Sequence, residues 1–529
     1  MPHDDLVRMA EKAARGGLFL FVGNALSIVI LAVGSIVIAR LLGPSNYGLY
    51  TLSMLMPLLF VSLADAGMNS ALIRIPARLR SEGDYPASNR AIRLGFLLKL
   101  ALSVTAFLIC YFGADIITIT LLNRPGLVPY LRLAGVLIIV QAVFDAATNC
   151  FIGLDLMQYS ASTQVIYSVL KSVLSPVLIL LGFGITGAIA AYVLSIFLAG
   201  VVGAVILFKK NGCARTTGTA IAQHVVKLST LLDYSLPLYV AMILAVFVTQ
   251  YQNLVLAHFA SDVQIGNFNA AWNFNSLLSI LIYPISISIF PMFSKMSTKT
   301  QRIDLARGFM LAVKYASLIL IPASIAIMVF SKDLVYLTYG RGYALAPQYL
   351  VIVSALYLLA GLGSNVIGSF LNGVAATRTV LKIDALTLAI YLPLGPALTW
   401  LWGPYGLLIA FILSNATSTL YAVRKVSVSF DAHPDLAASA RIFLASLVAG
   451  APSVVLVRLD VAGIGWVNLI TGGCLYLFVY LTMIPILGAI RLQDINNMET
   501  MLCKTQAVAI LLRPILAYEA RILSALSRN

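Results

Sequence analysis

Long apolar runs separated by short polar or glycine-containing breaks dominate the sequence. A membrane-spanning helix needs about 20 predominantly apolar residues, and such windows recur along most of the chain. We predict fourteen spans, at residues 17–39, 47–73, 94–114, 128–152, 160–183, 185–208, 234–258, 267–293, 309–331, 347–371, 380–400, 404–424, 438–458 and 465–490. Only Gly182–Gly184 and Trp402-Gly403-Pro404 divide two of the pairs, because glycine and proline end helices. The pattern is typical of an all-α polytopic membrane protein.

The first break lies at Gly43-Pro44, and the segment around it recurs further along the chain. At an offset of 218, Ala257-His258-Phe259 stands opposite Ala39-Arg40-Leu41. A second series has an offset of 219 and pairs Phe151 with Phe370, Gly184 with Gly403, Gly187 with Gly406, Ala191 with Ala410, and Leu194-Ser195 with Leu413-Ser414. We interpret these echoes as an internal duplication, in which spans one to six correspond to spans seven to twelve.

The duplication predicts how the chain is divided. Six spans are an even number, so both halves enter the membrane in the same orientation and are related by an axis along the membrane normal, with a site at their interface. We predict an N-lobe at 1–208, a cytoplasmic linker at 209–233, a C-lobe at 234–425, two extra spans within 426–490, and a cytoplasmic amphipathic tail at 491–529. The tail carries apolar residues at helical spacing among basic ones, which favours a helix on the inner membrane surface.

Composition supports the membrane assignment. Hydrophobic residues make up 60% and charged residues 10% of the 529 residues, and the mean hydropathy is +0.95, which excludes an ordinary soluble domain. The net charge of +15 would suggest nucleic acid as the partner of a soluble protein. In a membrane protein it is the expected excess of Lys and Arg in cytoplasmic loops, so we predict no nucleic-acid partner.

The distribution of basic residues predicts the orientation. With the N-terminus inside, 28 of the 35 Lys and Arg residues fall in inner segments, Lys99 and Lys314 among them. Only Arg40, Arg124, Arg132, Lys332, Arg341 and Arg458 fall at outer ends, and Lys171 lies within a span. Basic residues concentrate on the cytoplasmic side. We therefore predict a multi-pass protein of the cell membrane with both termini in the cytoplasm.

Polar side chains recur at helical spacing inside several predicted spans of both halves. The candidate cavity residues among them are Gln141, Asp145, Asn149, Gln164, Lys171, Gln250, Asn253, Asn269, Asn273 and Asn365. A single polar stripe can simply hold neighbouring helices together. Because the stripes occur in both halves, we predict that they line one shared wet cavity.

Three ionisable residues inside the spans suggest function more strongly. A charge at mid-bilayer costs roughly 2.5–3.5 kcal/mol on insertion scales and is usually functional or paired. Lys171 and Asp145 either pair with each other or face the cavity. Asp65, in Ala64-Asp65-Ala66-Gly67, either titrates or pairs with Arg74 or another base. Asp65 and Asp145 are the candidates for coupling to an ion.

No motif for nucleotide hydrolysis or metal catalysis occurs. The chain has neither a G-x-x-x-x-G-K-[ST] loop nor H-E-x-x-H, and its four histidines are scattered. The five cysteines have no metal-like spacing and serve as small apolar residues. We predict no cofactor, no metal and no enzymatic activity.

Two motifs carry a family resemblance. The segments A-R-L-L-G-P-S-N-Y-G-L-Y at Ala39–Tyr50 and D-A-G-M-N-S-A-L-I-R at Asp65–Arg74, with G-F-G-I-T-G-A at Gly182–Ala188 and W-G-P-Y-G-L at Trp402–Leu407, resemble the polysaccharide transport family. These are Wzx-type flippases of the multidrug/oligosaccharidyl-lipid/polysaccharide exporter superfamily. The resemblance implies two six-helix lobes around a central cavity, similar to MATE transporters and MurJ flippases, with two extra helices.

The resemblance also implies a substrate and a site. The substrate is a polyprenyl-diphosphate-linked oligosaccharide, moved from the cytoplasmic to the outer leaflet by alternating access for export of cell-surface polysaccharide. Arg40 and Arg74 lie in the matching motifs and would be basic cavity residues, although His258 replaces the arginine in the second half. Further implied partners are membrane lipid, a polysaccharide polymerase, glycosyltransferases, and H⁺ or Na⁺ as coupling ion.

Three other function classes stay open: a multidrug antiporter, a membrane enzyme, and a scaffold with a vestigial cavity. A cation-coupled multidrug antiporter of the same superfamily would have twelve spans and acidic cavity residues, whereas fourteen spans, Lys171 and the Arg40 motif favour the flippase. A membrane polysaccharide polymerase or ligase is disfavoured because the predicted outer loops are short. A sugar-diphosphate headgroup cannot cross hydrocarbon unaided, since its hydroxyls and charges would lose their partners, so a polar cleft suits the flippase.

Overall fold

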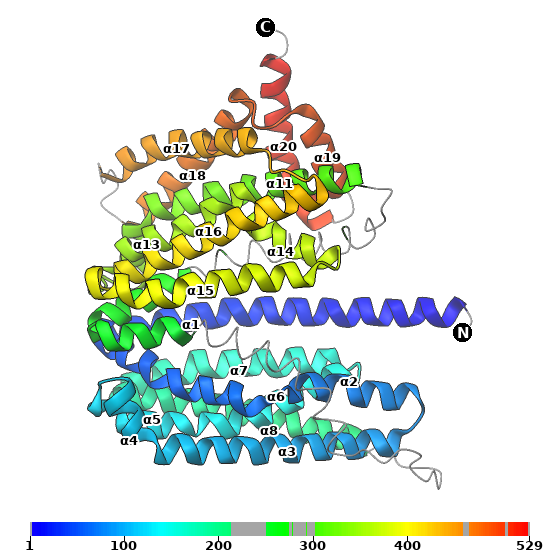
Figure 1. Ribbon diagram of the computed structural model, residues 1–529, viewed down its shortest axis with the longest axis vertical. Helices are drawn as coiled ribbons and strands as arrows, with labels where there is room; N and C mark the ends of the chain where they lie inside the picture. Colours follow the sequence, from blue (N-terminus) through cyan, green and yellow to red (C-terminus); the bar gives the residue numbers. More distant parts are fainter. Residues whose placement is uncertain are drawn as a thin grey trace. The chain divides into compact units, whose positions relative to one another are not determined.

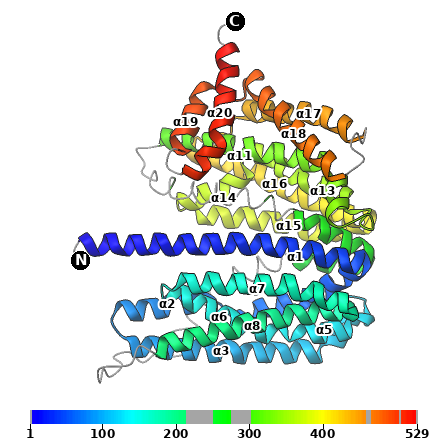
Figure 2. The ribbon, with the colours of Figure 1, turned by 180° about the vertical axis from the view of Figure 1, so that it is seen from behind.

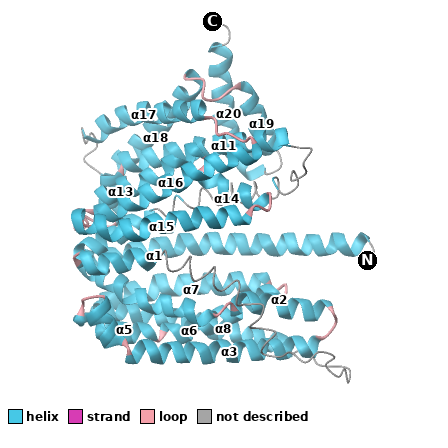
Figure 3. Cartoon of the chain, viewed as in Figure 1, coloured by secondary structure: helices cyan, strands magenta, loops and turns pink. Residues whose placement is uncertain are grey.

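The computed structural model describes residues 3–212, 250–274, 278, 293, 302–458, 465–502 and 506–526. These residues form helices and connecting turns, with no strand among them (Figure 3), as the apolar periodicity predicts. Contacts between residues divide the chain into two units, Met1–Asn269 and Ala270–Asn529. The predicted lobe boundaries at 208, 234 and 425 stay predictions, and most of the predicted linker lies outside the described residues.

Unit 1 is built from long helices that run beside one another (Figures 1 and 2). Its helices are α1 His3–Asp65, α2 Met68–Ser81, α3 Tyr85–Phe112, α4 Ala114–Ile116, α5 Val128–Gly135, α6 Leu137–Gly153, α7 Met157–Leu178 and α8 Gly184–Gly212. Shorter turns lie at Ile117–Leu121, Pro125–Leu127 and Ile179–Phe183, and the residues 251–259 and 262–269 are also helical.

Helix α1 contains two predicted spans because a glycine bends it. Gly43 has φ 74° and ψ 168°, a conformation open almost only to glycine, and Pro44 then begins the next helical segment. The break predicted at Gly43-Pro44 is confirmed. The second segment ends at Asp65, where Ala66 (φ 44°) and Gly67 (φ 74°) separate it from α2, so the predicted span 47–73 is a broken helix.

Glycines also set how closely α1 packs against α7. A Cβ at Gly23 would collide with Ala161, and one at Gly34 would collide with Ser172. The Ser172 hydroxyl donates a hydrogen bond to the Ile30 carbonyl at 3.0 Å. Small residues let helix backbones approach in membranes, where no hydrophobic force between helices is available. Polar groups on α7 are therefore held against α1.

Unit 2 has a similar all-helical construction. Its helices are α11 Arg302–Val329, α12 Ser331–Thr338, α13 Ala346–Ser354, α14 Ser364–Gly373, α15 Thr377–Trp402, α16 Pro404–Phe430, α17 Leu436–Arg458, α18 Gly465–Ile486, α19 Leu492–Leu502 and α20 Gln506–Leu526. A 3₁₀ segment, Ala355–Leu362, continues α13 and ends at Gly363 (φ 88°), where the chain bends by 49° into α14.

The predicted break between α15 and α16 is confirmed. Gly403 has φ 59° and ψ −146°, and Pro404 takes the first helical position of α16, where its missing N–H costs nothing. The break predicted at Gly182–Gly184 is confirmed too, because Gly182 (φ 93°) and Gly184 (φ 52°) end the α7 segment.

The described residues include nine helices that are long and apolar enough to cross a membrane, or ten with the bent α13–α14 segment. Two of them, Phe19–Ser81 and Met157–Lys210, have 63 and 54 residues and each contain two predicted spans. The predicted spans 234–258 and 267–293 lie largely outside the described residues. The chain is a multi-pass membrane protein, and the count of fourteen stays a prediction.

The C-terminal helices α19 and α20 belong to unit 2 and pack against its other helices. Lys314 of α11 and Asp494 of α19 form a buried ion pair of 2.6 Å, and Asp494 also accepts from the Arg491 backbone N–H at 2.8 Å. Leu516 of α20 is buried in a core with Ile484 of α18. The charge count placed Lys314 among the inner segments, and that assignment stays a prediction. The structure adds that the ammonium is buried inside the protein with a carboxylate partner.

Candidate functional site

A buried lysine lies at the centre of the polar interior of unit 1. Lys99, in the middle of α3, is 2% exposed. Its ammonium donates to Asp65 Oδ1 at 2.8 Å and to Asn69 Oδ1, and lies 3.6 Å from Asp145 Oδ2. Asp65 is the last residue of α1, Asn69 lies in the first turn of α2 and Asp145 belongs to α6, so one side chain of α3 connects four helices. We call Asp65, Asn69, Lys99, Gln141, Asp145 and Asn149 the Lys99 cluster.

The α6 members of the cluster form a stripe on one helix face. The Gln141 amide donates to Asp145 Oδ1 at 2.8 Å. The Asn149 amide donates to Asn69 Oδ1 at 3.0 Å and to the Asp145 carbonyl at 2.7 Å. Residues four apart on a helix are neighbours, which is why the spacing predicted the stripe. The structure therefore brings together three predicted site residues, Gln141, Asp145 and Asn149, with a fourth, Asp65.

The charges of the cluster do not balance. Two carboxylates, Asp65 and Asp145, face the single ammonium of Lys99, and the ionised cluster carries one excess negative charge. Asp65 Oδ2 is buried and makes no hydrogen bond to the described residues. A buried charge without a partner is costly. The orphaned oxygen therefore fits the uptake of one small cation, a proton or a metal ion of the same charge.

The broken helix explains why the lysine sits here. The carbonyl end of α1 carries a partial negative charge, and the break at Ala66-Gly67 leaves that end inside the protein. An ammonium beside Asp65 offsets both the carboxylate and the helix end. Of the two partners proposed for Asp65, Arg74 or another base, the structure selects another base, Lys99.

Lys171 does not pair with Asp145, which corrects one of the two interpretations above. Its ammonium lies 3.6 Å from the ring centroid of Tyr192 and 6.0 Å from that of Tyr167. Tyr167 and Tyr192 are stacked at 6.2 Å. A cation over an aromatic face gains roughly 0.5–2 kcal/mol, which holds Lys171 without a carboxylate. Asp145 pairs with Lys99 instead, because α3 brings that ammonium within reach.

Two further predicted residues of unit 1 meet at the helical segments that follow residue 250. The Asn269 amide lies 3.5 Å from Asn253 Oδ1 and 3.4 Å from the Thr51 hydroxyl of α1. Gln250 and Gln164 are half-buried, and Arg40 and Arg74 are exposed on α1 and α2. These residues are not members of the Lys99 cluster, and their place in a substrate cavity stays a prediction.

Unit 2 contains an open cavity of about 220 Å³ with a mixed polar and apolar lining. On α14, α15 and α16 the polar lining residues are Ser364, Asn365, Asp384, Thr387, Asn415, Ser418 and Thr419, and Tyr357 also lines the cavity. The Asn365 amide nitrogen is buried and makes no hydrogen bond to the described residues, so it can donate to a molecule in the cavity. The predicted residue Asn273 lies elsewhere in unit 2 and donates to the Tyr339 hydroxyl at 3.2 Å.

Sequence reasoning missed Lys99, Asn69 and Asp384. Lys99 was counted with the inner segments but not chosen as a site residue, although it stands alone between Leu98 and Leu100 in an apolar helix. A lone charge in such surroundings is the signal that could have found it. Asn69 lies within the family motif at Asp65–Arg74, and Asp384 lies in a predicted span.

Comparison with known proteins identifies the family. A family model described as polysaccharide biosynthesis protein matches residues 13–297, which is more than half of the chain. The chain belongs to the polysaccharide biosynthesis protein family. The resemblance seen in the motifs at Ala39–Tyr50 and Asp65–Arg74 is thereby confirmed.

Two curated relatives match along most of their length. The chain is 22% identical over 424 residues to the probable low-salt glycan biosynthesis flippase Agl15 of Haloferax volcanii. The aligned region covers 79% of this chain and 85% of that relative. It is 23% identical over 426 residues to the lipopolysaccharide biosynthesis protein WzxC of Escherichia coli K12. The aligned region covers 78% of this chain and 80% of that relative.

The family fold also matches a solved structure. The lipid II flippase MurJ in an inward closed conformation has a TM-score of 0.71 over 89% of this chain and 98% of that chain, at 14% identity. At this identity the likeness shows the fold alone. The predicted all-α membrane fold similar to MurJ is confirmed for this family member.

Proposed function

We propose that this protein is a flippase that moves a polyprenyl-diphosphate-linked oligosaccharide from the cytoplasmic to the outer leaflet of the cell membrane. The observation that carries the proposal is the match to two relatives, a glycan biosynthesis flippase and a lipopolysaccharide biosynthesis protein, along about four-fifths of each chain. Membership of the polysaccharide biosynthesis protein family supports the same reading. The activity is transport and makes or breaks no covalent bond in the cargo.

The polar interior suits this cargo physically. The sugar hydroxyls and the diphosphate lose their water partners in hydrocarbon, and amide and hydroxyl side chains can replace them without selecting one sugar. The cavity in unit 2 offers such groups on three helices. Arg40, Arg74 and Lys171 are the cations that we propose for the diphosphate, because charge-assisted hydrogen bonds to phosphate are strong. The charge count predicts that both termini lie in the cytoplasm, which is the side on which we propose that the cargo is loaded.

The Lys99 cluster is our candidate for coupling transport to an ion. Its one excess negative charge and the orphaned Asp65 Oδ2 support the binding of one proton or one Na⁺. Binding removes the charge excess and weakens the hold of the carboxylates on Lys99. Since Lys99 connects α1, α2, α3 and α6, a change at this point can alter how these helices pack.

A reconstituted assay tests the transport itself. Vesicles hold a fluorescent polyprenyl-diphosphate oligosaccharide in both leaflets, and an impermeant quencher reports the outer fraction. The protein is expected to bring the protected half of the signal within reach of the quencher, while empty vesicles retain it. No acceleration over empty vesicles would contradict the proposal. Export of a cationic dye without movement of the lipid would favour the multidrug antiporter.

The same assay under an imposed pH or Na⁺ gradient tests the coupling site. Asp65→Asn removes the excess charge, so the gradient should no longer change the rate. Asp115→Asn is the matched control, because Asp115 pairs with Arg132 at 2.7 Å in a half-exposed position outside the cluster. An Asp65→Asn variant with an unchanged gradient response would remove the cluster from the coupling mechanism and leave the flippase assignment intact.

A further inference from the structure

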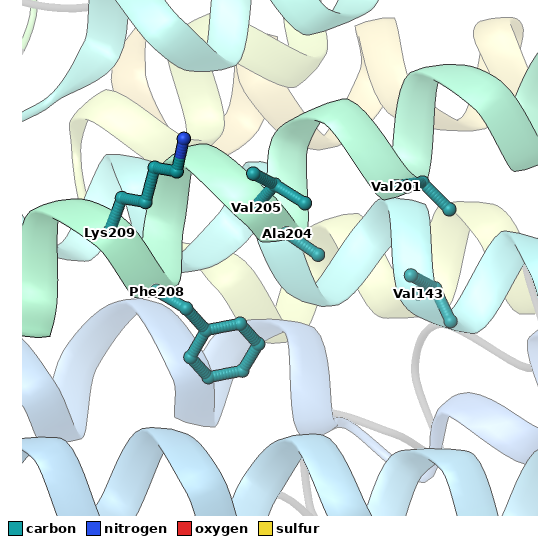
Figure 4. Close-up of a pocket in the computed structure, with 6 residues that line it drawn as sticks. All are labelled: Val143, Val201, Ala204, Val205, Phe208 and Lys209. Atoms are coloured by element: carbon teal, nitrogen blue, oxygen red, sulfur yellow. The ribbon is translucent and has the colours of Figure 1, made fainter.

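An apolar groove on unit 1 has a single lysine at one end. Five residues on one face of α8 line it together with Val143 of α6, and the open groove has a volume of about 480 Å³. The α8 residues are Val201, Ala204, Val205, Phe208 and Lys209. Their spacing of i, i+3, i+4, i+7 and i+8 is that of one helix face. Figure 4 shows Val201 and Val143 near one end of the groove and Lys209 at the other.

The groove arises from the way in which α6 and α8 pack. A Cβ at Gly200 would lie 3.1 Å from the Phe144 backbone nitrogen, and one at Gly203 would lie 3.2 Å from the Ala147 methyl. These glycines therefore bring the two backbones together. Beside this contact Val143, Val201, Ala204 and Val205 have short side chains that leave the groove unfilled. Val201 is 38%, Val205 47% and Phe208 42% exposed, so the groove is open along its length.

We propose that this groove binds one acyl chain of an anionic phospholipid, with the lipid phosphate at Lys209. Exposed apolar side chains of a membrane-spanning helix face hydrocarbon, and a chain lying in the groove contacts both helices at once. An acyl chain lies in hydrocarbon whether or not it occupies the groove, so transfer out of water does not hold it there. Contact with two helices and the charge must hold the lipid in place. Lys209 supplies that charge, as basic residues at helix ends do for acidic lipids.

Charge favours a phospholipid over the proposed cargo. A phosphodiester lipid such as phosphatidylglycerol carries one negative charge and meets one ammonium. A diphosphate carries more charge and calls for more cations. The neighbouring Lys210 does not line the groove, since its ammonium lies 4.9 Å from the ring centroid of Tyr159. Lys209 and Lys210 are neighbours in the last turn of α8. Lys209 lines the groove and Lys210 lies over Tyr159, so Lys210 is a suitable control for Lys209.

Native mass spectrometry of the purified full-length protein tests the proposal. Phosphatidylglycerol and phosphatidylcholine with identical acyl chains are titrated in detergent, and the dissociation constants are compared. Phosphatidylglycerol should bind more tightly. Lys209→Gln should weaken phosphatidylglycerol binding about fivefold, the effect of about 1 kcal/mol for one lysine, and leave phosphatidylcholine unchanged. Lys210→Gln is the control and should leave both lipids unchanged.

A second variant separates the groove from the charge. Ala204→Phe fills the groove and should weaken both lipids, whereas Val202→Phe, on another face of α8, should not. If Ala204→Phe does not elute as a single peak in size-exclusion chromatography, the smaller substitution Ala204→Leu tests the same point.

Three results would overturn the proposal. Equal affinity for the two lipids, or equal effects of Lys209→Gln and Lys210→Gln, would show that the charge is not recognised. Normal binding by the Ala204 variants would place the lipid elsewhere. Displacement of phosphatidylglycerol by a polyprenyl diphosphate at equal concentration would assign the groove to the cargo. The proposed phospholipid site does not depend on flippase activity. A negative result for the lipid site therefore leaves the proposed flippase function unaffected, and the reverse also holds.

Discussion

The two units share backbone features but differ in the chemistry of their interiors. At the offset of 219, Gly184 (φ 52°, ψ −130°) and Gly403 (φ 59°, ψ −146°) take nearly the same rare conformation before a long helix. A Cβ at Gly187 would crowd Leu178, and one at Gly406 would collide with Leu398. These matches support the interpretation of the chain as an internal duplication, because each glycine meets the same geometric need in each unit.

The polar residues at matching positions differ. Asp145 corresponds to Ser364, and Lys171 corresponds to Ile390. Unit 1 holds an interlocked cluster of two carboxylates and one ammonium, whereas the cavity in unit 2 is lined by amides, hydroxyls, the exposed Asp384 and apolar side chains. Duplicated helices can keep their turns while their interiors change, since turns depend on backbone sterics and interiors on side chains. The charged cluster suits ion coupling, and the open cavity suits sugar hydroxyls.

The largest expected effect comes from removing the lysine of the charged interior. Lys99→Met leaves Asp65 and Asp145 buried without a counter-charge, so the free energy of unfolding should fall by about 3–5 kcal/mol. Denaturant unfolding followed by fluorescence measures it. Ser364→Ala, at the position matching Asp145, should cost far less. The triple variant Lys99→Met, Asp65→Asn and Asp145→Asn should recover much of the loss. A loss below 1 kcal/mol would show that the cluster is not a structural centre of unit 1.

The next effect concerns a carboxyl group in unit 2. Burial raises the pKa of Glu519 from its ordinary value of 4.5 to about 7. The folded state therefore holds the proton more tightly than the unfolded state, and packing of α20 weakens as the pH rises from 4.5 through 7, by up to about 3 kcal/mol. Hydrogen exchange of α20, corrected for intrinsic rates, should show faster opening at pH 8 than at pH 5. Glu519→Gln should remove this dependence. A pH-dependent opening in that variant would place the titrating group elsewhere.

The shared turns predict a smaller, paired effect. Gly184→Ala and Gly403→Ala force a side chain into a conformation suited to glycine and should each cost about 1–3 kcal/mol. Gly473→Ala is the control: it lies within α18 with open space around it, and should gain roughly 0.5–1 kcal/mol. Thermal unfolding of the three variants measures the differences. Clearly unequal losses at Gly184 and Gly403 would weaken the case for equivalent turns.

The smallest effect concerns Lys171, whose matching position in unit 2 is the uncharged Ile390. Lys171→Ala removes one of the cations proposed for the diphosphate and should lower the rate of lipid-linked oligosaccharide transport roughly tenfold, the effect of about 1.5 kcal/mol for one hydrogen bond to a charged group, without loss of protein from the membrane. Tyr192→Phe retains an aromatic face and should keep most of the rate, and Ile390→Ala should keep it fully. Full activity of Lys171→Ala in the reconstituted assay would remove Lys171 from the site.

The charge count shows what sequence reasoning left out. It placed Lys99 and Lys314 among the inner segments, and the structure buries both ammonium groups in ion pairs. Burial does not determine on which side of the membrane a residue lies, so the predicted orientation stays a prediction. The count records the membrane side that basic residues favour, but it does not record that a neighbouring helix can supply a carboxylate partner.

The sequence by itself determined the helices, the membrane setting and the breaks at Gly43, Gly184 and Gly403. These depend on local properties, namely apolar length and the backbone freedom of single residues. It also determined the α6 stripe of Gln141, Asp145 and Asn149, since spacing along one helix is local. Only the tertiary structure decided that Asp65 and Lys99, 34 residues apart, and Asn69 and Asn149, 80 residues apart, meet in one cluster. The choice of partner for a buried charge depends on which helices pack together, and no local pattern records that.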